Sequence, residues 1–164
     1  MKNSIKTSIV TLLVSGLAAS SLLAANTAQQ TVTYEVSAIN ELSVSSPTVS
    51  LTVSAATAGS APTAASDTSA TYGITTNETN RKITGVINSN MPTGVALSIS
   101  LAAPTGASPE GAKNLSTDAT DLVTGISTLN ESGKMITYNL SATSAAGVVA
   151  SATKTVTLTI TAGS

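Results

Sequence analysis

Two acidic residues three positions apart are the chain's best candidates for catalysis. Asp118 and Asp121 provide the two carboxyl groups that a glycosidase needs as general acid and base. Their neighbours Thr117 and Thr120 favour a different interpretation, because Asp and Thr are ordinary capping residues of turns and helices. The spacing also falls short of the longer acidic loop that binds calcium. We therefore expect a turn or cap here and predict no catalytic residue.

The composition removes most other reactive chemistry. The 164 residues include no Cys, His, Trp or Phe and only three Tyr. Without His or Cys, the usual nucleophile–base pairs are missing, and so are the common ligands of zinc, haem and iron–sulfur clusters. Gly-rich phosphate-binding motifs are also absent from the sequence. We therefore expect a non-enzymatic protein with no cofactor-binding residues and no metal site.

The N-terminus has the pattern of an export signal. A short basic region precedes a largely apolar stretch from Ile9 to Leu23, which ends in the small residues Ala24-Ala25 that signal peptidase accepts. A transmembrane anchor is the alternative, but the stretch contains Ser and Gly and is short for a membrane span. We predict a signal peptide over residues 1–25 and one domain over residues 26–164. The mature protein would be secreted or on the cell surface, would pass through the bacterial periplasm, and would have no stable membrane span.

The predicted mature chain is weakly acidic. Cleavage removes two of the seven basic residues and none of the eight acidic ones, which leaves five against eight and a net charge of −3. Because nucleic acid is held through Lys and Arg contacts with phosphates, we expect no nucleic-acid partner. The lack of Cys means that the fold does not rely on disulfides, although an exported protein could form them.

The elements that must position these residues are strands. Thr or Ser alternates with Val, Ile or Leu along much of the chain, most clearly over residues 153–161. Since successive side chains of a strand point to opposite faces, the apolar residues would face a core and the threonines solvent. Strands of this kind between Gly, Pro and Asn turns indicate an all-β antiparallel β-sandwich, immunoglobulin-like or pilin-like. A closed barrel is the alternative.

Turn residues and tyrosines predict where the chain reverses and which side chains enter the core. We expect a hairpin joined at Asn77–Asn80, a helical turn within residues 114–126 and a turn over residues 130–133. The three tyrosines share the period of their apolar neighbours, which predicts core positions for all of them. The tyrosines are Tyr34, Tyr72 and Tyr138, and strands are expected over residues 31–37, 39–44, 49–53, 70–75, 81–88, 95–101, 135–142 and 151–161.

The first and last strands are candidate assembly sites. Sheet edges expose backbone donors and acceptors unless they are blocked, and these two segments carry one Glu and one Lys respectively and no Pro. A strand of this kind can complete the sheet of a neighbouring subunit by strand addition. Pairing of residues 31–37 within their own domain is the alternative, which the sequence favours slightly. The candidate strand-addition residues are Val32, Tyr34, Val36, Val156, Leu158 and Ile160.

The export signal, the Thr/Ser-rich strands and the ending Thr155-Val156-Thr157-Leu158-Thr159-Ile160-Thr161 loosely resemble small secreted bacterial β-sandwich proteins of the fimbrial and spore-coat-U type. Chaperone–usher pilins commonly have a disulfide and a Tyr beside the C-terminus, and this chain has neither. The resemblance implies a fimbria- or pilus-like filament or matrix subunit that assembles with itself or with other surface proteins. An extracellular carbohydrate- or surface-binding module is the alternative function.

Overall fold

The structure is a computed structural model that describes residues 26–46 and 48–163. The predicted signal peptide, residues 1–25, lies outside the described residues. The chain divides into two units, the first ending at Glu35 and the second beginning at Val36, and each is described by itself. In the first unit, residues 26–35 are exposed and form no strand or helix.

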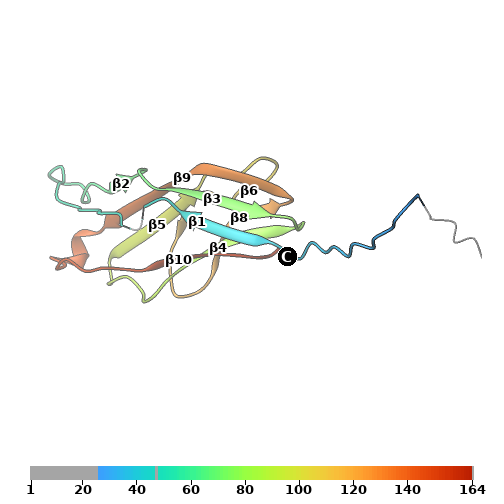
Figure 1. The fold of residues 1–164 in the computed structure, drawn as a ribbon. Coiled ribbons are helices and arrows are strands. Elements are labelled where there is room, and N and C mark those ends of the chain that lie inside the picture. Colours follow the sequence, from blue (N-terminus) through green and yellow to red (C-terminus); the bar gives the residue numbers. More distant parts are fainter. Residues whose placement is uncertain (1–25, 47, 164) are drawn as a thin grey trace, which may run out of the picture. The chain divides into compact units, whose positions relative to one another are not determined.

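The second unit is all-β and consists of two antiparallel sheets (Figure 1). The first sheet has the strand order β1-β3-β9-β5-β7, with β2 also paired to β9, and the second has the order β10-β4-β8-β6. The described elements are β1 (Asn40–Val44), β2 (Ala65–Asp67), β3 (Thr71–Thr76), β4 (Arg81–Ile87), β5 (Val95–Leu101), β6 (Ser108–Pro109), β7 (Lys113–Asn114), β8 (Thr120–Ile126), β9 (Leu129–Ala142), the short 3₁₀ helix η1 (Ser144–Ala146) and β10 (Val156–Ala162).

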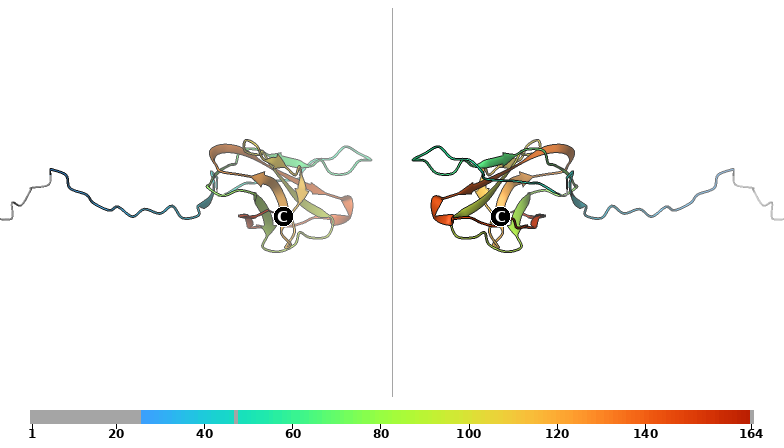
Figure 2. Two further views of the ribbon diagram at one scale, coloured as in Figure 1. Left: turned by 90° about the vertical axis from the view of Figure 1, so that its right-hand side faces the viewer. Right: turned by 90° about the vertical axis from the view of Figure 1, so that its left-hand side faces the viewer.

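This architecture agrees with the predicted antiparallel sandwich. Figure 2 shows the second unit end-on, with the loop between β1 and β2 extending away from the sheets. The buried residues come from both sheets and are almost all aliphatic, for example Ile99 of β5 and Ile83 of β4. A core of this kind gains stability from many modest burials, about 1.5–3 kcal/mol for each Val, Leu or Ile. The immunoglobulin-like subtype stays a prediction.

Tyr72 is the large aromatic residue of this core. Its ring is buried, and its hydroxyl donates a hydrogen bond of 2.7 Å to the carbonyl oxygen of Ala102, which satisfies the buried polar group. Burial, together with the charge of Glu131, raises the pKa of Tyr72 to about 12. The core prediction is also right for Tyr138, which packs against the core from a partly buried position. It is wrong for Tyr34, which is exposed.

The predicted hairpin at Asn77–Asn80 is wrong, although both of its strands exist. β3 belongs to the first sheet and β4 to the second, so these four residues connect the two layers. Turn residues predict only that the chain reverses, and the reversal here passes over the end of the sandwich. Among the described strands, no two that follow one another in sequence pair with each other.

Two further local predictions are corrected. Residues 114–126 contain the last residue of β7 and all of β8 and no helical turn, because Leu122, Val123 and Ile126 are buried in the core as strand residues. The turn expected over residues 130–133 lies inside β9. There one extra residue of β9 faces β3, and Gly133 adopts a φ of 69°, so the sequence signal for a turn marks a β-bulge.

Two predicted strands do not form. Residues 31–37 belong to no strand. Residues 49–53 have alternating half-buried and exposed side chains, as a strand would, yet they too belong to no strand. Alternation of apolar and polar residues shows which side chains face a core. It does not show whether the backbone has a neighbouring strand with which to form hydrogen bonds.

Candidate functional site

An apolar groove of about 630 Å³ opens along the two edge strands β1 and β10. β1 provides Leu42 and Val44 to its walls, and β10 provides Val156 and Leu158. The segment after β1 adds Val49 and Leu51, both half-buried. Other apolar lining residues belong to the core or pack near it: Ala70, Met91, Leu97, Ile136, Tyr138 and Leu140.

The groove has almost no charge. Lys154 is the one charged residue among those that line it. Its ammonium Nζ is already engaged, because it donates hydrogen bonds to Ser89 Oγ at 2.7 Å and to the carbonyl oxygen of Asn90 at 2.9 Å. Burial also raises the pKa of the Tyr138 phenol. The groove is suited to an uncharged occupant, because its lining combines the apolar residues above with small polar ones: Ser43, Ser46, Thr48, Thr153, Thr155 and Thr157.

The backbone of β10 leaves hydrogen-bonding groups at the groove. The amide N–H of Asn88 donates to the carbonyl of Thr155, and that of Gly163 donates to the carbonyl of Asn80. Since hydrogen-bonded pairs alternate along an antiparallel ladder, the odd-numbered residues of β10 direct their N–H and C=O groups toward β4. The backbone groups of Val156, Leu158 and Ile160 therefore point to the open edge.

β1 presents the same arrangement from the other sheet. The N–H of Ser45 donates to the carbonyl of Thr71, and the N–H of Asn77 donates to the carbonyl of Ile39. By the same alternation, odd-numbered residues of β1 bond to β3, and the backbone groups of Leu42 and Val44 point outward. An incoming strand could therefore pair with the edge of β1 or with the edge of β10.

The structure distributes the six predicted strand-addition residues over three places. Val156 and Leu158 line the groove, whereas Ile160 is half-buried further along β10 and outside the lining. Val32, Tyr34 and Val36 are 73%, 90% and 79% exposed. These three alternate with more polar residues, so an extended backbone would present them on one face.

Sequence reasoning missed the wall opposite β10. Leu42, Val44, Val49 and Leu51 were expected in ordinary paired strands, and their alternating pattern does not distinguish a paired strand from an open edge. The open edge becomes visible only when the sheet order places β1 at the end of one sheet and β10 at the end of the other.

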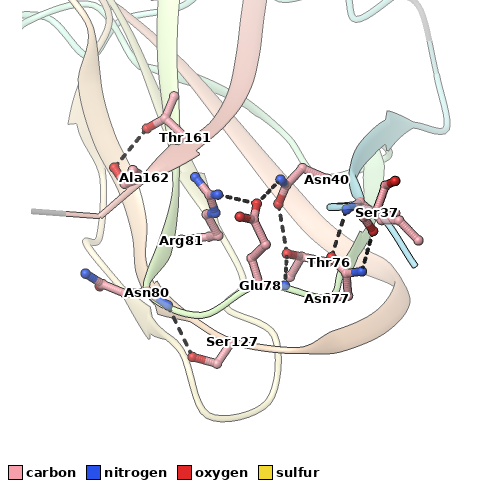
Figure 3. A network of polar contacts seen from close by, with 11 residues as sticks. Ser37, Asn40, Thr76, Asn77, Glu78, Asn80, Arg81, Ser127, Thr161 and Ala162 are labelled. Atoms are coloured by element: carbon pink, nitrogen blue, oxygen red, sulfur yellow. Dashed lines mark hydrogen bonds and ion pairs between the residues drawn. The ribbon is translucent and has the colours of Figure 1, made fainter. Parts of the chain in front are cut away.

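A polar network holds the start of the second unit (Figure 3). The Ile39 N–H donates to Asn77 Oδ1 at 2.8 Å, and Asn77 Nδ2 donates to the carbonyl oxygen of Ser37 at 2.8 Å. Asn40 connects the network further, because its Oδ1 accepts a hydrogen bond of 2.8 Å from Thr76 Oγ1. Sequence reasoning assigned Asn77 only to a turn.

Glu78 forms the charged part of this network. Its carboxylate accepts a hydrogen bond from Asn40 Nδ2 and pairs with Arg81, and these two contacts lower the pKa of Glu78. Arg81 is partly buried against Glu78, and the neighbouring Lys82 pairs with Asp121 at 3.1 Å.

The candidate acid pair is separated into two different roles. Asp121 is a β8 residue in the ion pair with Lys82, whereas Asp118 lies in a bend where its N–H donates to Ser116 Oγ at 3.1 Å. Within residues 26–46 and 48–163, no group of three or more His, Cys, Asp or Glu side chains could hold a metal ion. The same residues include no helix that is long and apolar enough to cross a membrane.

No protein-family model, curated protein or solved structure matches the chain. The function must therefore be inferred from the groove and from the exposed apolar segment.

Proposed function

We propose that the protein is a secreted, non-enzymatic structural subunit of a surface fibre or extracellular matrix, and that it assembles by β-strand addition. One observation carries this proposal. The chain has an apolar groove with open backbone edges on both walls, and it also has an exposed segment, residues 31–37, whose apolar residues alternate. The groove has room for an additional strand, and residues 31–37 have the side-chain pattern of a strand but belong to no sheet.

The two features are chemically complementary. A strand placed in the groove would pair with the outward backbone groups of β1 or of β10, and its apolar side chains would cover the groove. Val32, Tyr34 and Val36 have the alternation needed to direct three side chains inward together. Burial of each valine would contribute about 1.5–3 kcal/mol at most, which is ample for a subunit contact repeated along a fibre.

Electron microscopy and sedimentation of the exported protein test the proposal. We expect fibres from the full mature chain, and a folded monomer after deletion of residues 26–34. The circular dichroism spectrum and melting temperature should be unchanged, because this deletion removes no strand residue, takes away the exposed Val32 and Tyr34, and keeps Ser37, whose carbonyl accepts the hydrogen bond from Asn77. A full chain that stays monomeric at high concentration, or a deleted chain that assembles as before, would contradict strand addition.

The exposure of Tyr34 supports the alternative function, an extracellular carbohydrate- or surface-binding module. An aromatic ring that is 90% exposed can stack on a ligand, and its hydroxyl can form a hydrogen bond. Binding to a glycan array that is lost in Tyr34→Ala, in a protein that forms no fibres, would favour this function over the structural one.

A further inference from the structure

We infer that Asn77 is a positioning residue that keeps residues 31–37 out of their own groove, so that the groove receives this segment from a second copy of the chain. The inference rests on the proposed strand addition. It concerns a question that strand addition leaves open, since a donor segment attached just before β1 could in principle close its own subunit and stop assembly.

Asn77 prolongs the ladder between β1 and β3 beyond the end of β1. Its backbone N–H bonds to the carbonyl of Ile39, and its side-chain Oδ1 accepts from the N–H of the same residue. The side-chain Nδ2 donates to the carbonyl of Ser37, which lies two residues before Ile39. The side-chain amide of Asn77 thus provides the donor and the acceptor that a neighbouring strand would provide, and it holds residues 37–39 as a continuation of β1.

A donor that entered its own groove would have to reverse immediately before β1. A two-residue turn at Ala38-Ile39 would pair residue 35 with residue 42 and residue 33 with residue 44. Because paired side chains share a face, Thr33 and Glu35 would then enter the groove, and the apolar residues would face outward. Such turns also favour Asn-Gly, which is absent here.

A three-residue turn gives the right face at a different cost. It would pair Tyr34 with Leu42 and Val32 with Val44, but Ser37, Ala38 and Ile39 would all have to leave the ladder. The last residue of such a turn adopts a left-handed conformation, which is strained for a β-branched residue such as Ile39. The reversal would also break both side-chain hydrogen bonds of Asn77. Intermolecular insertion requires none of these changes.

Engineered cysteines can measure self-closure directly, because the natural chain has none. In Val32→Cys/Val44→Cys, the two thiols of one chain oppose each other only in the self-closed form with the inward apolar face, whereas insertion into a second copy links two chains. Oxidation at low concentration followed by a non-reducing gel separates self-linked monomer from all other forms. We expect little self-linked monomer with Asn77 present. We expect about tenfold more with Asn77→Ala, since two hydrogen bonds no longer oppose the reversal.

A matched control separates positioning from general destabilisation. Asn90→Ala also removes a side-chain bond to a backbone amide, that of Thr117, at a site outside the network. It should leave the self-linked fraction unchanged at a similar melting temperature. Asn77→Asp keeps an acceptor for Ile39 and loses the donor to Ser37, so an intermediate increase is expected, and this variant serves if Asn77→Ala does not fold.

The outcomes distinguish the two proposals. Abundant self-linked monomer with Asn77 intact, or the same fraction in Asn77→Ala and Asn90→Ala, overturns the role of Asn77 while strand addition stands. Absence of fibres from the natural chain, together with no self-linked monomer in any variant, overturns strand addition itself. Fibres from the natural chain with a selective increase in Asn77→Ala support both.

Discussion

Truncation of Val36 to alanine should weaken assembly without weakening the subunit. The substitution removes two methyl groups, which are worth about 1.6 kcal/mol when fully buried, at about 0.8 kcal/mol each. Val36 is 79% exposed in the free chain, so insertion into a groove would bury most of this surface. The expected loss is about 1.3 kcal/mol for each donor segment, which corresponds to about a tenfold higher critical concentration for assembly.

The assay is the concentration dependence of assembly, followed by light scattering and by sedimentation of the polymer. The double variant Val32→Ala/Val36→Ala should raise the critical concentration about sixtyfold, because Val32 is 73% exposed and its contribution adds about 1.2 kcal/mol. Thr33→Ala is the matched control, since it lies in the same segment on the opposite face. Its effect should stay within about twofold.

The same variants should not change the stability of the monomer. Surface substitutions of this kind usually change the free energy of unfolding by less than about 0.5 kcal/mol. The reasoning is refuted if Thr33→Ala impairs assembly as much as Val36→Ala, because the face of the segment would then not matter. The prediction also fails if Val36→Ala lowers the free energy of unfolding of the monomer by more than about 1 kcal/mol, since Val36 would then already be buried within its own subunit.

Three further predictions concern the fold. Ile83→Ala should lower the free energy of unfolding in urea by about 2–5 kcal/mol because Ile83 is completely buried, whereas Val148→Ala, at a fully exposed site, should change it by less than about 0.5 kcal/mol. Above pH 10 the unfolded chain ionises Tyr72 and the folded chain, with a pKa of about 12, does not. Stability should therefore fall by about 2–3 kcal/mol between pH 10 and 12, and this dependence should be clearly reduced in Tyr72→Phe; burial also raises the pKa of Tyr138, which accounts for what remains. Hydrogen bonds from Lys134 and Thr105 lower the pKa of Glu131 to about 2, so its contribution is present above pH 4.5 and is lost as the pH falls toward 2; Glu131→Gln should flatten this acid dependence.

Each of these predictions has a clear contrary result. Equal effects of Ile83→Ala and Val148→Ala would place Ile83 outside the core. A slope of stability against pH that is the same in the natural chain and in Tyr72→Phe would show that another group titrates above pH 10. An unchanged acid slope in Glu131→Gln would show that the carboxylate has no net interaction in the folded state.

The period of the sequence predicted which residues face the core more reliably than it predicted their partners. Tyr72, Leu97 and Ile99 lie in predicted strands and are buried as expected. Residues 31–37 have an equally regular period, yet they form no strand. A side-chain pattern reflects the need for burial, and that need can be met by another chain as well as by the same one.

One wall of the groove could be predicted from the sequence, and the other could not. Val156 and Leu158 were expected at an edge because the last strand carries a long, weakly guarded alternation, and they do line the groove. The opposite wall was not predictable, because it depends on β1 lying at the edge of the other sheet. The role of Asn77 depends on two side-chain bonds to residues almost forty positions away, which no local signal reports.

The absence of paired neighbours among the described strands has a consequence for the time course of folding. β9 must find β3, more than fifty residues earlier in the chain, and β10 must find β4 across a similar interval. Local hairpins normally form in microseconds and provide a nucleus, but here every ladder requires closure of a longer loop. We therefore expect folding in the slow range of all-β proteins, milliseconds to seconds. During that interval the unpaired edge of β10 would be exposed to strands of other chains, which favours aggregation.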